Sequence, residues 1–126
     1  MGGCDMVLVF VGGGLGAVCR FAVSCLMNRL PAGAFPVGTV AVNLAGCFLI
    51  GLCYALVGGK LLTPSVRLFL MTGFLGGFTT FSAFSLETVN ALKNGFAVLA
   101  LINVAASVVV GLLLAMLGIR VGSRFF

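Results

Sequence analysis

Charged residues divide the chain into four long apolar stretches. No charged residue occurs at positions 6–19, 30–59, 68–86 or 94–119. Crossing the hydrocarbon core of a bilayer takes a helix of about 20 mostly apolar residues. The pattern therefore predicts an all-α integral membrane protein, a single domain over residues 1–126 with four membrane-spanning helices. The expected spans are approximately 6–27, 37–57, 67–92 and 96–119.

The first apolar stretch is too short to cross a membrane unless it includes Arg20. At 1.5 Å per residue, positions 6–19 reach only about 21 Å, short of the roughly 30 Å hydrocarbon core. The helix is therefore expected to continue through Arg20 to about Met27. An ionisable residue at that depth is either a functional candidate or a side chain that extends to the interface.

Composition supports the membrane assignment and excludes several classes of protein. The chain is 62% hydrophobic and 7% charged, whereas a soluble domain is about 45–50% apolar and about 25% charged. The net charge of +5 does not indicate nucleic-acid binding, because the basic residues are scattered singly. With no histidine and no paired carboxylates, the chain is not expected to be an enzyme. The five cysteines are expected to be small packing residues.

The charges flanking the spans leave the orientation in the membrane open. Four spans place both ends of the chain on one side. That side carries Lys60, Arg67, Arg120 and Arg124, and the other carries Arg29 and Lys93. Four basic residues against two is a weak bias under the positive-inside rule. A single orientation and insertion in both orientations are equally compatible with this count.

The segment Thr72–Thr88, TGFLGGFTTFSAFSLET, carries the most unusual pattern. Two adjacent glycines followed by two β-branched threonines make a poor helix centre. We therefore expect a break in the third span near Gly77. Non-helical backbone at membrane depth is tolerated only where it is buried in protein, lines a wet cavity or binds an ion.

Two stripes at a spacing of three are expected beyond this break. One is aromatic and the other carries hydroxyl groups: Phe78, Phe81 and Phe84, and Thr79, Ser82 and Ser85. Hydroxyl donors beside the positive edges of aromatic rings suit a partly dehydrated anion. Asn43 in the second span is either a further donor or an interhelical hydrogen bond. Glu87 is either an interfacial charge or the lining of a pathway mouth.

These residues resemble the small fluoride-channel family, Fluc (also called CrcB), over essentially the whole chain. The matching segments are GGGLGAVCR with Arg20, GTVAVNLAG with Asn43, and TGFLGGFTTFSAFS. The resemblance implies an antiparallel, dual-topology homodimer with two fluoride pores that passively exports cytoplasmic fluoride. It also implies location in the prokaryotic plasma membrane.

The resemblance further implies roles for individual residues. A structural sodium ion at the dimer axis would be held by the backbone carbonyls of Gly76 and Thr79. The expected anion pathway consists of Arg20, Asn43, Thr80, Phe81, Ser82, Phe84 and Ser85. One departure is Ala83, which stands where the family usually has threonine and removes one hydroxyl from the row.

Two other functions are alternatives to the channel. A proton-coupled small multidrug transporter has a similar size, but it needs an acid within the membrane, and the first span carries Arg20 instead. A non-transporting assembly subunit would explain the glycine-rich faces but not Arg20 and Asn43 inside spans. Fluoride efflux from proteoliposomes distinguishes the channel from both.

Overall fold

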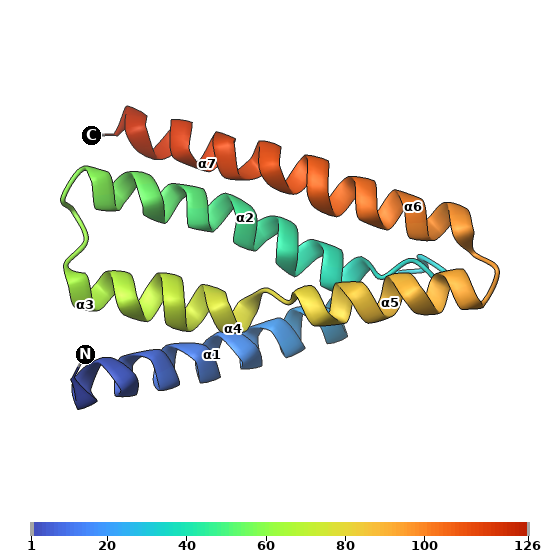
Figure 1. Cartoon of the computed structure of the whole chain (residues 1–126), viewed down its shortest axis with the longest axis horizontal. Coiled ribbons are helices and arrows are strands. Elements are labelled where there is room, and N and C mark those ends of the chain that lie inside the picture. Colours follow the sequence, from blue (N-terminus) through green and yellow to red (C-terminus); the bar gives the residue numbers. More distant parts are fainter. Residues whose placement is uncertain (1, 126) are drawn as a thin grey trace.

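The computed structural model describes residues 2–125, and these form a bundle of long helices (Figure 1). Four helical units are long and apolar enough to cross a membrane: Gly3–Met27, Val37–Gly58, Pro64–Lys93 and Ala97–Arg124. The prediction of four such helices is confirmed.

The first two units are single α-helices, α1 (Gly3–Met27) and α2 (Val37–Gly58). The third unit is built from several pieces: α3 (Pro64–Arg67), the π-helical η1 (Leu68–Leu75), α4 (Gly76–Phe78) and α5 (Phe81–Lys93). The fourth comprises α6 (Ala97–Ala105), the π-helical η2 (Ala106–Val110) and α7 (Gly111–Arg124). π-Helical turns inside α-helices are rare and are frequently found at functional sites.

Turn chemistry fixes where the third unit begins and ends. The Thr63 hydroxyl oxygen accepts from the Val66 N–H at 3.3 Å, and Pro64 takes the first helical position. At the other end, Gly95 follows α5 with a φ of 82°, a conformation that glycine adopts at little cost. The chain then reverses into α6 within a few residues.

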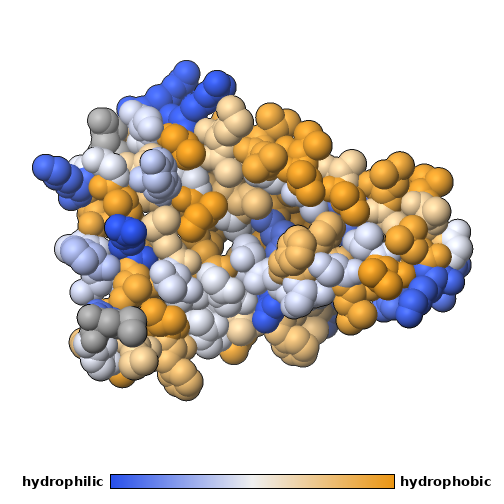
Figure 2. Space-filling view, in the orientation of Figure 1, coloured by the Kyte–Doolittle hydropathy of each residue, from blue (hydrophilic) through white to orange (hydrophobic). Residues whose placement is uncertain are grey.

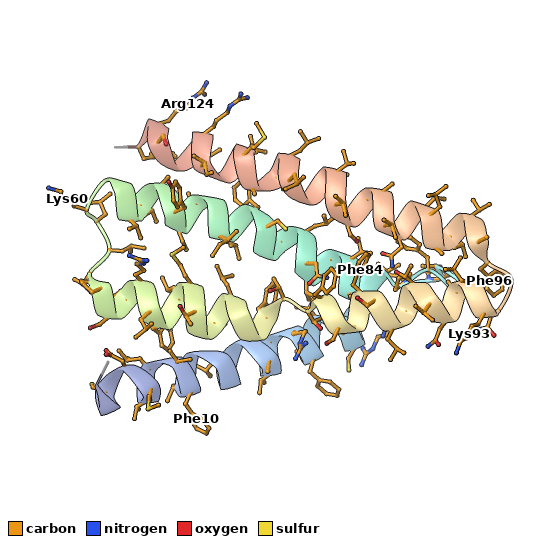
Figure 3. All side chains as sticks on the ribbon, in the orientation of Figure 1. Phe10, Lys60, Phe84, Lys93, Phe96 and Arg124 are labelled. Carbon is orange, nitrogen blue, oxygen red and sulfur yellow. The ribbon has the colours of Figure 1, made fainter. Side chains whose placement is uncertain are left out.

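The helices run up and down the bundle (Figure 1). Both ends of the chain lie at one end of the bundle, together with the α2–α3 connection, and the other two connections lie at the opposite end. α1 packs along η1 and α4, whereas α2 packs along α7. Figure 3 places Lys60 and Arg124 at the first end and Lys93 at the second, so the labelled charges lie near the two ends of the bundle.

Glycines bring the helices into close contact. A methyl group on Gly16 would collide with the Phe74 carbonyl oxygen, and one on Gly51 would collide with the Ala115 carbonyl oxygen. Small residues at such positions let helices approach closely in lipid, where little hydrophobic driving force acts between them. Replacing Gly16 or Gly51 by a larger residue would therefore separate a helix pair.

The apolar side chains of this protein mostly face outward. Within the described part of the chain, the buried apolar cluster consists of Val42, Leu75 and Phe78, whereas Phe10 is 81% exposed and Phe21 is 72% exposed. Figure 2 shows hydrophobic residues over much of one face, with hydrophilic residues gathered mainly toward the two ends. This distribution is the one expected for a protein whose sides face lipid.

Candidate functional site

The third unit leaves helical geometry at Thr79 and Thr80. α4 ends at Phe78 and α5 begins at Phe81. Between them, Thr79 has φ −87° and ψ 157°, and Thr80 has φ −152° and ψ 114°. Both residues are therefore extended. The Thr80 hydroxyl oxygen caps α5 by accepting from the Ala83 N–H at 3.2 Å.

Asn43 of α2 holds this extended link through two hydrogen bonds. Its Nδ2 donates to the Thr80 carbonyl oxygen at 3.0 Å, and its Oδ1 accepts from the Thr80 N–H at 2.8 Å. The side-chain amide thus pairs with the Thr80 backbone as a neighbouring strand would. One N–H of the Asn43 amide is used in this way, and the second N–H is available for another acceptor.

The link changes the partners of two backbone carbonyls. In an uninterrupted helix, the Thr80 N–H would donate to the Gly76 carbonyl, and the Ala83 N–H would donate to the Thr79 carbonyl. These N–H groups instead donate to Asn43 Oδ1 and to Thr80 Oγ1. The Gly76 and Thr79 carbonyl oxygens therefore lose their helical donors. Neutral carbonyl oxygens are suitable ligands for a hard cation.

A cavity of about 390 Å³ opens beside the link, and we call it the α4–α5 cavity. Its apolar wall includes Ile50, Met71, Leu75 and Val108. Its polar lining comes from Asn43, Thr79, Thr80 and Ser107. Among residues 2–125, no charged side chain lines it.

Two predicted phenylalanines also line the α4–α5 cavity. The ring centroids of Phe81 and Phe84 are 5.5 Å apart, with the ring planes tilted by 46°. Figure 3 shows Phe84 near the middle of the bundle, between α5 and α2. Phe81 is 78% exposed in the single chain, so the cavity has an open flank there.

The predicted stripes hold only from Phe81 onward. Phe78 is 8% exposed and stacks on Phe74, with ring centroids 5.8 Å apart, rather than joining Phe81 and Phe84. Thr79 donates its hydroxyl to the Leu75 carbonyl at 2.9 Å, on the preceding turn. Extending the stripes back to Phe78 and Thr79 was wrong, because a spacing of three aligns residues only within one continuous helix.

Ser82 and Ser85 lie on α5 but do not line the α4–α5 cavity. Ser85 donates to the Phe81 carbonyl at 2.9 Å. The Ser82 and Thr80 hydroxyl oxygens are 3.3 Å apart, so one of the two donates to the other. Because that pair shares one hydrogen bond, one of its two protons is left to donate elsewhere.

Arg20 lies in a second cavity, of about 320 Å³, on the α1 side of the link. We call it the Arg20 cavity. Thr39, Ala83 and Glu87 also line it, and Thr80 lines both cavities. Thr80 is thus the residue that the two cavities share. Arg20 is half-buried, and Glu87 brings a carboxyl group into the same space.

Glu87 is held by α2. The Thr39 hydroxyl donates to Glu87 Oε1 at 2.7 Å. The other carboxyl oxygen, Oε2, is buried and has no hydrogen-bond partner among residues 2–125. Glu87 therefore lines a cavity, and its role at the mouth of a pathway stays a prediction. Thr39 was missed, because a threonine inside an apolar span gives no signal until its partner is known.

A chain of three hydrogen bonds connects α5 to the fourth unit. Thr88 donates to the Phe84 carbonyl at 2.7 Å, and Asn103 donates to the Thr88 hydroxyl oxygen at 3.0 Å. Ser107 donates to Asn103 Oδ1 at 3.3 Å. Asn103 and Ser107 are four positions apart and so share a helix face, but this spacing does not identify Thr88 as the partner.

Comparison with known proteins places the chain in a family. Residues 7–119 match the family described as "CrcB-like protein, Camphor Resistance (CrcB)". A relative from Parabacteroides distasonis named "Fluoride-specific ion channel FluC" is 43% identical over 117 residues, 93% of this chain and 91% of the relative. A relative of the same name from Rhizobium etli is 52% identical over 103 residues, 81% of this chain and 82% of the relative.

A third relative of that name, from Agrobacterium fabrum, is 43% identical over 123 residues, which is 97% of this chain and 98% of the relative. This last match covers nearly the full length of both proteins, and the family match over residues 7–119 includes all the residues that line the two cavities. Together with the four helices of membrane-spanning length, they identify a multi-pass membrane protein. The chain belongs to the CrcB-like protein family.

Proposed function

We propose that this protein is a fluoride-selective passive anion channel that exports cytoplasmic fluoride and so gives fluoride resistance. The observation that carries the proposal is the extended link at Thr79–Thr80, which Asn43 holds between a neutral cavity and a cavity containing Arg20. The names of the relatives support the choice of ion, since each is named a fluoride-specific ion channel.

The two cavities offer an anion different kinds of stabilisation. Arg20 attracts it from solution, because a positive charge in a partly buried cavity raises the local anion concentration. In the α4–α5 cavity, the anion exchanges water for neutral donors: the second N–H of Asn43 and, when Ser82 donates to Thr80, the Thr80 hydroxyl proton. The positive edges of Phe81 and Phe84 complete this environment.

We propose that the working unit is an antiparallel, dual-topology homodimer in the plasma membrane. Two features of the single chain support a partner on the α5 face. Phe81 is 78% exposed, and Ser82 carries its hydroxyl outside the α4–α5 cavity. A second copy on that face would close the open flank of the cavity and would enclose Ser82 and Ser85.

We also propose a structural sodium ion between the two copies, held by the Gly76 and Thr79 carbonyls. Both carbonyls have lost their helical donors, and a methyl group on Gly76 would meet no atom within 4 Å. This donor set fits a hard monovalent cation, and two copies would supply four oxygens. When bound, such an ion would supply positive charge that attracts the carbonyl oxygens of both copies and so stabilises the contact between their Thr79–Thr80 links.

Fluoride efflux from proteoliposomes tests the channel function. Purified wild-type protein, reconstituted at low density with internal fluoride, should release it much faster than empty liposomes do. Chloride release measured side by side should stay near the level of empty liposomes. Fluoride release equal to that of empty liposomes would refute the proposal, and equal release of the two ions would refute the selectivity.

Protease protection tests the topology. A cleavable tag after the C-terminus should be removed from about half of the copies when protease is added outside sealed vesicles. Removal from all copies or from none would show a single orientation and would exclude the antiparallel homodimer.

Replacing sodium by a large organic cation tests the sodium site. This replacement should shift the dimer toward monomer in detergent, and an unchanged dimer would count against the sodium site.

A further inference from the structure

The hydrogen bonds behind the α4–α5 cavity form a chain with a fixed direction. It runs from Ser107 through Asn103 and Thr88 to the Phe84 carbonyl, with donor–acceptor distances of 3.3, 3.0 and 2.7 Å. Asn103 is 2% exposed, so water does not replace either of its partners.

The direction follows from the chemistry of the last acceptor. A carbonyl oxygen only accepts, so the Thr88 hydroxyl must give its proton to Phe84. The Thr88 oxygen is then left to accept, which turns the Nδ2 of the Asn103 amide toward it. Oδ1 of the same amide therefore faces Ser107, and the Ser107 hydroxyl must donate to it.

This arrangement decides what Ser107 presents to the α4–α5 cavity, which it lines. With its proton committed to Asn103, Ser107 faces the cavity with oxygen lone pairs, which repel an anion. An anion gains the Ser107 donor only if the hydroxyl rotates away from Asn103. The bond from Ser107 to Asn103 is the longest of the three, so it is the hydrogen bond of the chain that breaks most easily.

We propose that Asn103 is a positioning residue that withholds the Ser107 proton from the α4–α5 cavity and thereby weakens anion binding there. Thr88 sets the direction of the Asn103 amide and so acts together with Asn103 on the Ser107 proton. The inference rests on the proposed channel function. In a channel, the hydrogen-bond chain from Ser107 to Thr88 has a role in transport, because an ion that binds too tightly cannot leave.

Freeing the Ser107 proton should therefore tighten anion binding. Asn103→Leu removes the competing acceptor with little change of volume. Thr88→Val removes the constraint on the amide, so that Asn103 can turn its Nδ2 to Ser107 and leave the Ser107 proton for the cavity. In both variants, the fluoride concentration that half-saturates efflux should fall by roughly twofold to tenfold, the effect of about one hydrogen bond.

Two controls separate positioning from a merely structural role. Thr88→Ser keeps the hydroxyl and should keep the wild-type half-saturating concentration. In a Ser107→Ala background, Asn103→Leu should no longer change that concentration, because no proton remains to be released. A half-saturating concentration that rises or stays unchanged in Asn103→Leu, or a fall that persists without the Ser107 hydroxyl, would overturn the inference.

A measurement without transport distinguishes this inference from the channel function. If wild-type vesicles release no fluoride, the channel function fails, and thermal unfolding then tests the chain itself. The melting shifts of Thr88→Val and Ser107→Ala should be non-additive when Asn103 is present and additive in Asn103→Leu. Additive shifts with Asn103 in place would overturn the directional chain.

Discussion

The two cavities that meet at Thr80 differ in charge. The Arg20 cavity contains Arg20 and Glu87, whereas the α4–α5 cavity is lined by neutral polar groups and phenyl rings. A charge attracts any anion over a distance, but it does not distinguish fluoride from chloride. Short-range donors reward the small ion that approaches them most closely. The comparison indicates that the Arg20 cavity attracts anions and that the α4–α5 cavity selects among them.

Removing Asn43 should have the largest effect, because Asn43 holds the residue that the cavities share. Asn43→Ala leaves the Thr80 N–H and carbonyl without their partners, at a cost of roughly 3 kcal/mol. If that energy holds the conducting geometry, fluoride efflux should fall about a hundredfold. Asn90→Ala is the matched control, since Asn90 is an exposed amide on α5. Wild-type efflux in Asn43→Ala would refute the role of the link.

Removing the positive charge should weaken attraction while leaving selection intact. Arg20→Gln should lower fluoride efflux at low fluoride and low salt by about tenfold, or roughly 1.4 kcal/mol, whereas Arg20→Lys should keep most of it. The deficit should shrink as inert salt is added, because salt screens the charge in the wild type. The fluoride-to-chloride ratio should stay constant. A changed ratio would mean that Arg20 takes part in selection.

Removing an aromatic ring from the α4–α5 cavity should lower fluoride efflux in a way that does not depend on salt, unlike the loss of Arg20. Phe81→Ile removes the aromatic partner of Phe84 and should lower fluoride efflux by roughly threefold to tenfold, at all salt concentrations. The dimer should remain intact in size-exclusion chromatography. Phe10→Ile is the matched control, because Phe10 is a similarly exposed ring on α1. A salt-dependent loss in Phe81→Ile would contradict the division between the cavities.

The sequence predicted the fold well because the bilayer imposes a simple rule. Spans must be long and apolar, so charged residues mark their ends without reference to tertiary contacts. Arg20 was placed within a span by length alone. The break itself was expected near Gly77, but Gly76 and Gly77 are helical within α4, and the extended residues are Thr79 and Thr80.

Contacts between helices were less accessible to sequence reasoning. The partners of Asn43 and Thr39 are Thr80 and Glu87, separated from them by 37 and 48 positions. One sequence contains no signal for such pairing. Phe78 shows a second limit, because periodicity assumes that one helix continues. Once the backbone extends at Thr79, the direction of every later side chain is reset.

The smallest expected effect comes from Glu87, the acid that lines the Arg20 cavity. Glu87→Gln keeps an oxygen to accept from Thr39 but removes a negative charge beside Arg20. If Glu87 only offsets the attraction of Arg20, fluoride efflux at low salt should rise about twofold, or roughly 0.4 kcal/mol. Asp5→Asn, at the N-terminal end of α1, removes the same charge away from both cavities and should have no effect. A fall in efflux would instead show that the carboxyl group, with its unpartnered Oε2, takes part in passing the ion. The sign of the change therefore decides whether the Arg20 cavity only attracts the anion or also takes part in conducting it.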